Sequence, residues 1–220
     1  MKIKLLFCLV LLLSGCTEDA VTPDNEPPPS EYSYPETKEA VMEVFATAYD
    51  DMDIDSYNDC LHESFKFIFS AEDAAQYEIS NGYFERAEDL GVMTRTFSGD
   101  SHETPYGTQP GFQSITIANW SMVGGTSWVL TPADHADFPN SYRGLFSIYM
   151  VYAENGGEHT HTIDTEQLFY VKSYEDTHSD GTVYDRWYLV GQEDVVRIED
   201  FNGYKGEEGV SWGAVKALFM

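Results

Sequence analysis

The spacing of hydrophobic residues changes along the chain, from three or four positions in its first half to two positions in its second half. From Thr37 onward, apolar residues recur every three or four positions, which predicts a helix with Thr37 as its N-cap. The apolar face of this helix consists of Ala40, Val41, Val44, Phe45, Ala48 and Tyr49. A second, short helix is predicted from Ile54 to Leu61, and the residues from Ala71 to Leu90 are also expected to be helical. Their apolar faces should pack on a sheet.

Alternation of apolar and polar residues predicts the strands. The segment Phe65–Phe69 alternates and places three phenylalanines on one face. A polar stretch from Gly91 to about Pro110, rich in Gly, Ser and Thr, predicts a long loop. The expected strands after it are Phe112–Met122, Tyr142–Ala153, His159–Ser173 and Arg186–Gln192, with a turn from Glu175 to Gly181 before the last of them. In the first of these strands, strict alternation places Ile115 and Ile117 opposite Trp120.

This order of elements, with helices first and strands after, predicts the fold class. We expect an α+β domain over residues 35–220, in which N-terminal helices pack on a curved, mostly antiparallel sheet. A barrel or sandwich of many short strands is the alternative, and the early helices disfavour it. With 42% hydrophobic and 15% aromatic residues, the chain has enough apolar material for a buried core.

The first sixteen residues have the pattern of an export signal. Lys2 and Lys4 precede an apolar run from Leu5 to Leu13, which is too short to span a bilayer and is followed by small residues. The sequence Leu13-Ser14-Gly15-Cys16 resembles the bacterial lipobox, which implies cleavage before Cys16 and acylation of its thiol. We therefore predict a lipoprotein signal peptide over residues 1–15 and a membrane anchor at Cys16. An ordinary cleaved signal or a buried N-terminal helix is the alternative.

Residues 16–34 are expected to form an extended tether after the lipidated cysteine, because this segment is polar, acidic and rich in proline. The predicted location is the bacterial cell envelope. Thr17 is not the aspartate that retains lipoproteins in the inner membrane of enterobacteria, so the outer membrane is favoured if the host is Gram-negative.

The formal net charge of −26 disfavours nucleic acid and anionic lipid surfaces as partners, because like charges repel. A cationic ligand or a divalent cation remains open. Of the three cysteines, Cys8 leaves with the signal and Cys16 carries the lipid, so Cys60 has no partner for an intramolecular disulfide. We expect Cys60 to be a buried small apolar residue.

Several short segments resemble the nuclear-transport-factor-2-like superfamily, whose cone-shaped fold is shared with ketosteroid isomerases and polyketide cyclases. They are Ala48-Tyr49, Asp53 with Tyr57, Phe65-x-Phe67-x-Phe69, Trp187–Asp194, and Ser211–Leu218, the last similar to a closing motif of uncharacterised bacterial lipoproteins. The resemblance implies a cone with an internal apolar pocket, and a possible homodimer through the outer face of the sheet. It implies no particular reaction, because this fold carries many functions.

Two sets of residues are candidates for a site. His159 and His161 lie two positions apart on a predicted strand, so both imidazoles could bind one metal ion, although surface histidines are the simpler interpretation. The second set is aromatic and would line the cone. The aromatic residues expected in the interior are Tyr49, Phe67, Phe69, Trp120, Trp128, Phe146, Tyr149, Phe169, Tyr170, Trp187 and Tyr188. The pocket candidates among them are Tyr49, Phe67, Phe69, Trp120, Tyr149 and Trp187.

These features favour a lipid-anchored domain that binds a small apolar ligand or a partner protein, without a cofactor. The alternative is a hydrolase or isomerase of the cone-fold type, in which a pocket histidine acts with Asp or Glu, with or without a metal at His159 and His161. That alternative requires one histidine, from His62, His135, His159 and His161, to lie buried in the pocket beside a carboxylate.

Overall fold

The computed structural model describes residues 34–104, 107–156, 159–178, 180–195 and 211–220. The residues from Tyr32 to Met220 form one compact unit. The predicted signal peptide, Cys16 and the tether up to residue 33 lie outside the described residues. None of the described helices is both long enough and apolar enough to cross a bilayer.

The first two helices begin where the sequence predicts them. Helix α1 (Lys38–Asp50) starts after Thr37, whose hydroxyl accepts a hydrogen bond from the backbone N–H of Ala40 at 3.0 Å. Helix α2 (Ile54–Cys60) is capped by the carboxylate of Asp53, which accepts the N–H of Asp55 at 3.0 Å. These side chains satisfy N–H groups that the first turn of a helix leaves without partners.

The region from Ala71 to Pro110 differs from the predicted single helical segment followed by a long loop, so that prediction is wrong. It contains two helices with a short strand between them, α3 (Ala71–Gln76), β2 (Tyr83–Glu85) and α4 (Arg86–Ser98), and two three-residue strands follow α4. Helix α4 continues through Gly91, because the burial of Val92 and Met93 outweighs the roughly 1 kcal/mol that a glycine costs a helix. It ends at Gly99, which adopts a left-handed conformation with φ of 72°.

The main sheet has the order β2-β1-β9-β8-β7-β5, and a two-residue strand, β6, pairs with β7. Its remaining strands are β1 (Leu61–Ile68), β5 (Phe112–Met122), β6 (Val129–Leu130), β7 (Tyr142–Glu154), β8 (Thr160–Thr177) and β9 (Val183–Val195). All neighbours are antiparallel except β1 and β9, which run parallel. Two further strands, β3 (His102–Thr104) and β4 (Gly107–Gln109), form a separate small sheet.

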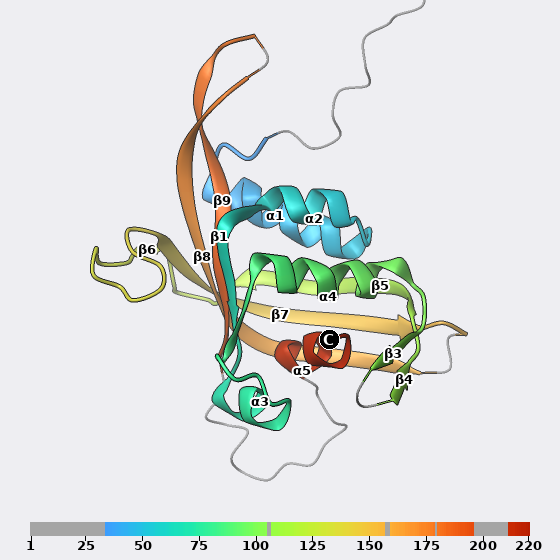
Figure 1. The fold of residues 1–220 in the computed structure, drawn as a ribbon. Coiled ribbons are helices and arrows are strands. Elements are labelled where there is room, and N and C mark those ends of the chain that lie inside the picture. Colours follow the sequence, from blue (N-terminus) through green and yellow to red (C-terminus); the bar gives the residue numbers. More distant parts are fainter. Residues whose placement is uncertain (1–33, 105–106, 157–158, 179, 196–210) are drawn as a thin grey trace, which may run out of the picture. The chain divides into compact units, whose positions relative to one another are not determined.

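The hairpin of β8 and β9 is longer than predicted and extends beyond the neighbouring strands (Figure 1). The predicted turn from Glu175 to Gly181 is therefore too long, since β8 continues to Thr177. Side chains across the hairpin support the extension: the rings of His178 and Tyr184 stack at 3.9 Å. Such cross-strand pairs stabilise an antiparallel ladder even where it leaves the core.

Helices α1, α2 and α4 and the C-terminal helix α5 (Trp212–Leu218) lie on one face of the curved sheet (Figure 1). The core lies between these layers and is rich in aromatic side chains, with Phe45, Tyr49, Tyr57 and Phe169 fully buried. The predicted α+β fold class, with helices on a curved, mostly antiparallel sheet, is confirmed. The sheet does not close, because β2 and β5 are its edges in the described part of the chain.

Candidate functional site

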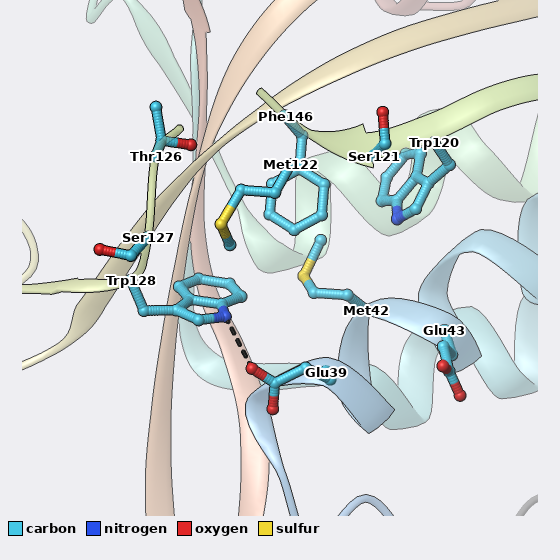
Figure 2. Close-up of a pocket in the computed structure, with 10 residues that line it drawn as sticks. All are labelled: Glu39, Met42, Glu43, Trp120, Ser121, Met122, Thr126, Ser127, Trp128 and Phe146. Atoms are coloured by element: carbon cyan, nitrogen blue, oxygen red, sulfur yellow. Dashed lines mark hydrogen bonds between the residues drawn. The ribbon is translucent and has the colours of Figure 1, made fainter. Parts of the chain in front are cut away.

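A cavity of about 440 Å³ lies between helix α1, the end of β5, the segment before β6, and β7 (Figure 2). This volume lies within the range of small-molecule sites, which is roughly 300–1,000 Å³. The pocket residues are Glu39, Met42, Glu43, Trp120, Ser121, Met122, Thr126, Ser127, Trp128 and Phe146. The large side chains among them are apolar, and the charged ones both come from α1.

Trp120 reaches the pocket because β5 contains a bulge. The register between β5 and β7 shifts between Ile117 and Asn119, so that one extra residue is inserted in β5. The shift turns Trp120 toward the helices, where its ring lies 5.7 Å from that of Phe45. The prediction that Trp120 faces away from Ile117 is therefore wrong, because strict alternation holds only without a bulge.

Trp128 forms a second wall of the pocket and is held by contacts on two sides. Its indole N–H donates a hydrogen bond of 3.0 Å to Glu39 Oε1 on α1. Its six-membered ring lies against Gly144 of β7, where a Cβ atom would be only 2.9 Å from Trp128 Cζ3. Only glycine at this position leaves room for the indole, so the sheet and the helix together fix the orientation of Trp128.

Two methionines and Phe146 complete the apolar lining. Met42 points from α1 toward Met122 and Phe146, and their side chains meet in the middle of the site (Figure 2). Met42 and Phe146 are buried. Because a methionine side chain is unbranched and flexible, this part of the lining can adapt to ligands of different shape.

The charged residues of the pocket are both acidic. Glu39 and Glu43 lie on the side formed by α1, across from Met122 and Phe146 (Figure 2). Lys38 is directed elsewhere, because its ammonium lies 4.6 Å from the ring centre of Tyr142. Within the described ranges, neither Glu39 nor Glu43 forms an ion pair with Lys, Arg or His. The pocket therefore has negative potential at this side.

Trp120 contributes an unpaired donor to the pocket wall. Its Nε1 atom is buried and has no hydrogen-bond partner within the described part of the protein. An unsatisfied buried N–H costs about 1–3 kcal/mol. In Figure 2 the indole nitrogen is turned toward Met42 and Glu43. A ligand oxygen beside the flexible Met42 side chain would satisfy this donor.

Other predicted pocket residues lie in the core. Tyr49 and Phe67 are fully buried and Phe69 is nearly so. The ring of Tyr49 packs at 4.7 Å on Trp212 of α5, and Phe67 packs at 4.8 Å on Phe69. These aromatic side chains and α5 fill the space between the sheet and α4, so they contribute packing at this end of the core.

The same region contains a buried ion pair that the sequence analysis missed. Lys216 Nζ of α5 donates to Asp89 Oδ1 of α4, and the Tyr57 hydroxyl donates to Asp89 Oδ2 at 2.5 Å. Burial raises the pKa of Tyr57 well above its usual value and lowers that of Lys216. The sequence carries no local signal of this pair, since its partners are 127 positions apart.

The remaining two aromatic candidates lie elsewhere. Tyr149 is 37% exposed, and the alternation of β7 places it on the face of the sheet away from the helices. The ring of Trp187 packs at 5.7 Å on Tyr142. Of the six predicted pocket residues, Trp120 lines the cavity, together with Trp128 and Phe146 from the wider aromatic set. Glu39, Met42, Glu43 and Met122 were not predicted.

His159 and His161 lie at the start of β8. His159 is exposed, whereas His161 is half-buried and its Nε2 lies 2.7 Å from Glu154 Oε1. Its ring also contacts Phe112 at 5.8 Å. Over the described residues, no group of three or more His, Cys, Asp or Glu side chains is placed to hold a metal ion. The metal site at this pair stays a prediction.

The other two histidines of the enzymatic alternative are engaged by aromatic rings. His62 stacks on Tyr174 at 4.0 Å, and burial lowers its pKa. His135 accepts the N–H of Phe138 at its Nδ1 atom and contacts the ring of Tyr170 at 5.7 Å. None of the six histidines lines the pocket.

No family model matches the chain, and no curated protein is significantly similar to it. Similar solved structures include a nuclear-transport-factor-2-like superfamily protein from Salmonella enterica, with 9% identity and a TM-score of 0.42, over 74% of this chain and 92% of that one. A ketosteroid isomerase-like protein from Erwinia carotovora has 10% identity and a TM-score of 0.37, over 72% and 94%. AusH from Aspergillus nidulans has 11% identity and a TM-score of 0.39, over 78% and 100%.

At these values the similarity itself carries no argument about what the chain binds or does. The described residues themselves show two N-terminal helices, a curved sheet in which β1 runs parallel to β9, and helices on one face of that sheet. The α+β architecture predicted from the sequence is thus confirmed, and function must be argued from the pocket.

Proposed function

We propose that the protein is a lipid-anchored protein of the bacterial cell envelope whose domain binds a small apolar ligand in the pocket of Trp120 and Trp128. The observation that carries this proposal is the preformed cavity of about 440 Å³, walled by two indoles and by Phe146. Apolar, concave sites of this size with a few polar groups are typical of ligand binding. The anchor rests on the resemblance of residues 13–16 to a lipobox.

A binding function agrees better with the pocket than acid–base chemistry does. Its lining offers two exposed glutamates and no histidine. The buried acid Asp89 and the buried base Lys216 are paired with each other and enclosed by Tyr57 and Phe67. They are therefore engaged in holding α5 to the core.

Ligand binding can be tested with a neutral aromatic probe, naphthylethanol, by isothermal titration calorimetry. The full chain is used with Cys16→Ser, so that it can be purified without detergent. We expect saturable binding that weakens at least about tenfold in Trp128→Ala, because one wall of the pocket is lost. Trp187→Ala is the matched control, since Trp187 packs on Tyr142 away from the pocket. Absence of binding, or equal affinity in both variants, would refute the proposal.

The anchor is tested separately by fractionation of a bacterial host that expresses the full chain. Cys16→Ser should move the protein from the membrane fraction to the soluble fraction, because several acyl chains are lost. Cys8→Ser is the control, since Cys8 lies inside the predicted signal and should leave fractionation unchanged. Membrane association that persists in Cys16→Ser would contradict the anchor.

A further inference from the structure

We infer that the ligand of this pocket is a neutral molecule with a carbonyl oxygen, which accepts a hydrogen bond from the indole N–H of Trp120. The inference rests on the proposed binding function and concerns the polar group of the ligand. Three features of the pocket carry it: the unpaired N–H of Trp120, the engagement of the other polar groups of the lining, and the two glutamates of α1.

The indole of Trp120 is held in place by the core. It packs against three phenyl rings, with distances between ring centres of 5.7 Å to Phe45, 5.8 Å to Phe146 and 5.2 Å to Phe169. The indole cannot turn its N–H outward to solvent without breaking these contacts. Because Nε1 is buried and has no partner in the described part of the chain, this donor has lost its hydration without a replacement.

The rest of the lining does not supply the missing acceptor. Glu39 accepts the N–H of Trp128 at 3.0 Å, so the other indole of the pocket is satisfied from within the chain. Ser121 follows Trp120 in β5, so its side chain points to the opposite side of the strand, where its hydroxyl donates to Asn119 Oδ1 at 3.1 Å. Of the two indole N–H groups in the pocket, that of Trp120 is left for a ligand.

Glu43 is exposed, and Figure 2 shows its carboxylate at the end of the side chain away from Trp120. Reaching the buried N–H would remove this carboxylate from water, which is costly for a charged group. A neutral oxygen from a ligand does not carry this cost.

Met42 controls access to the donor. Its side chain is buried, and the Trp120 nitrogen is turned toward it (Figure 2). Because a methionine side chain is unbranched and flexible, its end can give way to a ligand oxygen. The oxygen then lies beside Nε1, while the apolar body of the ligand occupies the cavity against Trp128 and Phe146.

The charge of the pocket restricts the acceptor to a neutral group. The described lining contains Glu39 and Glu43 and no Lys, Arg or His. A ligand carboxylate could accept the N–H of Trp120, but it would be repelled by these two side chains and by the formal net charge of −26. A carbonyl oxygen accepts without charge, and, unlike a hydroxyl, it brings no hydrogen that needs an acceptor of its own.

Three naphthalenes substituted at the same position test the inference. Acetylnaphthalene carries the carbonyl, isopropenylnaphthalene has a methylene group in place of the carbonyl oxygen, and naphthoate carries a negative charge. Their affinities are measured by displacement of naphthylethanol in isothermal titration calorimetry, on the full chain with Cys16→Ser. We expect the ketone to bind about tenfold tighter than the alkene, because it satisfies a buried donor, and naphthoate not to bind measurably.

Trp120→Phe removes the donor but keeps an aromatic ring, so the preference for the ketone should fall to about twofold or less. Trp187→Phe is the matched control, because Trp187 packs on Tyr142 away from the pocket, and it should keep the tenfold preference. A second measurement needs no substitution of Trp120. In the NMR spectrum of the isotope-labelled protein, the indole N–H resonance of Trp120 should move downfield with the ketone and not with the alkene, because a hydrogen bond deshields the proton.

The outcomes separate this inference from the proposed function. The carbonyl inference is wrong if the alkene or naphthoate binds as tightly as the ketone, if the preference survives in Trp120→Phe, or if the Trp120 resonance responds equally to ketone and alkene. In each of these cases the proposed binding function stands. If naphthylethanol and the three probes all fail to bind, the proposed function itself is wrong.

Discussion

Replacing Lys216 by methionine should destabilise the protein far more than the same change at an exposed lysine. The Lys216 ammonium is 1% exposed and pairs with Asp89, which is fully buried. Methionine retains most of the aliphatic volume but leaves the Asp89 carboxylate in the core, with the Tyr57 hydroxyl as its remaining donor. Removing one partner of a buried ion pair costs about 3–5 kcal/mol. Since a domain of this size is stable by about 5–15 kcal/mol, this loss is a large fraction of the total.

The free energy of unfolding is measured by urea titration with far-UV circular dichroism. Lys66→Met is the matched control, because Lys66 pairs with Asp137 at 3.0 Å while the two side chains are 29% and 38% exposed. We expect a loss below about 1 kcal/mol there. Asp89→Asn/Lys216→Met removes both charges and should be clearly more stable than Lys216→Met alone. The reasoning fails if Lys216→Met loses no more than Lys66→Met, or if the double variant recovers nothing.

Three further predictions concern the same core. Gly213→Ala should lower the free energy of unfolding by about 1–3 kcal/mol, because a Cβ there would lie 2.5 Å from Asp194 Oδ2. Gly91→Ala is the control: the nearest atom to a Cβ there is 3.9 Å away, so this variant should be neutral or stabilising in the same titration. Burial, and next the Asp73 carboxylate, raise the pKa of Asp194 from 3.8 to about 7. The protonated carboxyl therefore stabilises the fold fully below about pH 4, and this contribution is lost as the pH rises to 7. In Asp194→Asn the free energy of unfolding should change less over this pH range, by roughly 4 kcal/mol at most. Burial raises the pKa of Cys60 to about 12, so peptide mapping after iodoacetamide treatment at pH 8 should find Cys60 modified only in unfolded protein.

The elements that the sequence predicts well are those in which local signals and burial agree. Helix α1 has both a capping residue, Thr37, and an apolar face, and both are used in the structure. Only the first five residues of helix α4 were predicted as helical, because Gly91 looked like a stop signal. Long-range contacts extend the helix past Gly91. Met93 packs on the Tyr49 hydroxyl, 44 positions earlier, and a local sequence pattern does not indicate such a contact.

The pocket was only partly predictable for a related reason. Aromatic composition indicates that indoles and phenyl rings will gather, but the register of each strand decides which of them face the same side. The bulge in β5 moves the Trp120 side chain to the other face of the sheet, and no residue type in that strand indicates a bulge. Glu39 and Met42 were not predicted as pocket residues, because the pocket wall that they face includes Trp128, which is 89 positions away from Glu39.

The position of α5 explains why the pocket lies where it does. Trp212 and Phe219 are buried among core aromatics, and Arg95 of α4 donates to the Phe219 carbonyl, so this end of the space under the helices is occupied by the chain itself. Lys216 supplies the positive charge that the buried Asp89 requires. At the pocket, by contrast, α1 contributes two carboxylates and the described part of the chain supplies them with no basic partner. One acidic position in the protein is thus neutralised from within by Lys216, whereas the two carboxylates beside the pocket are exposed to solvent.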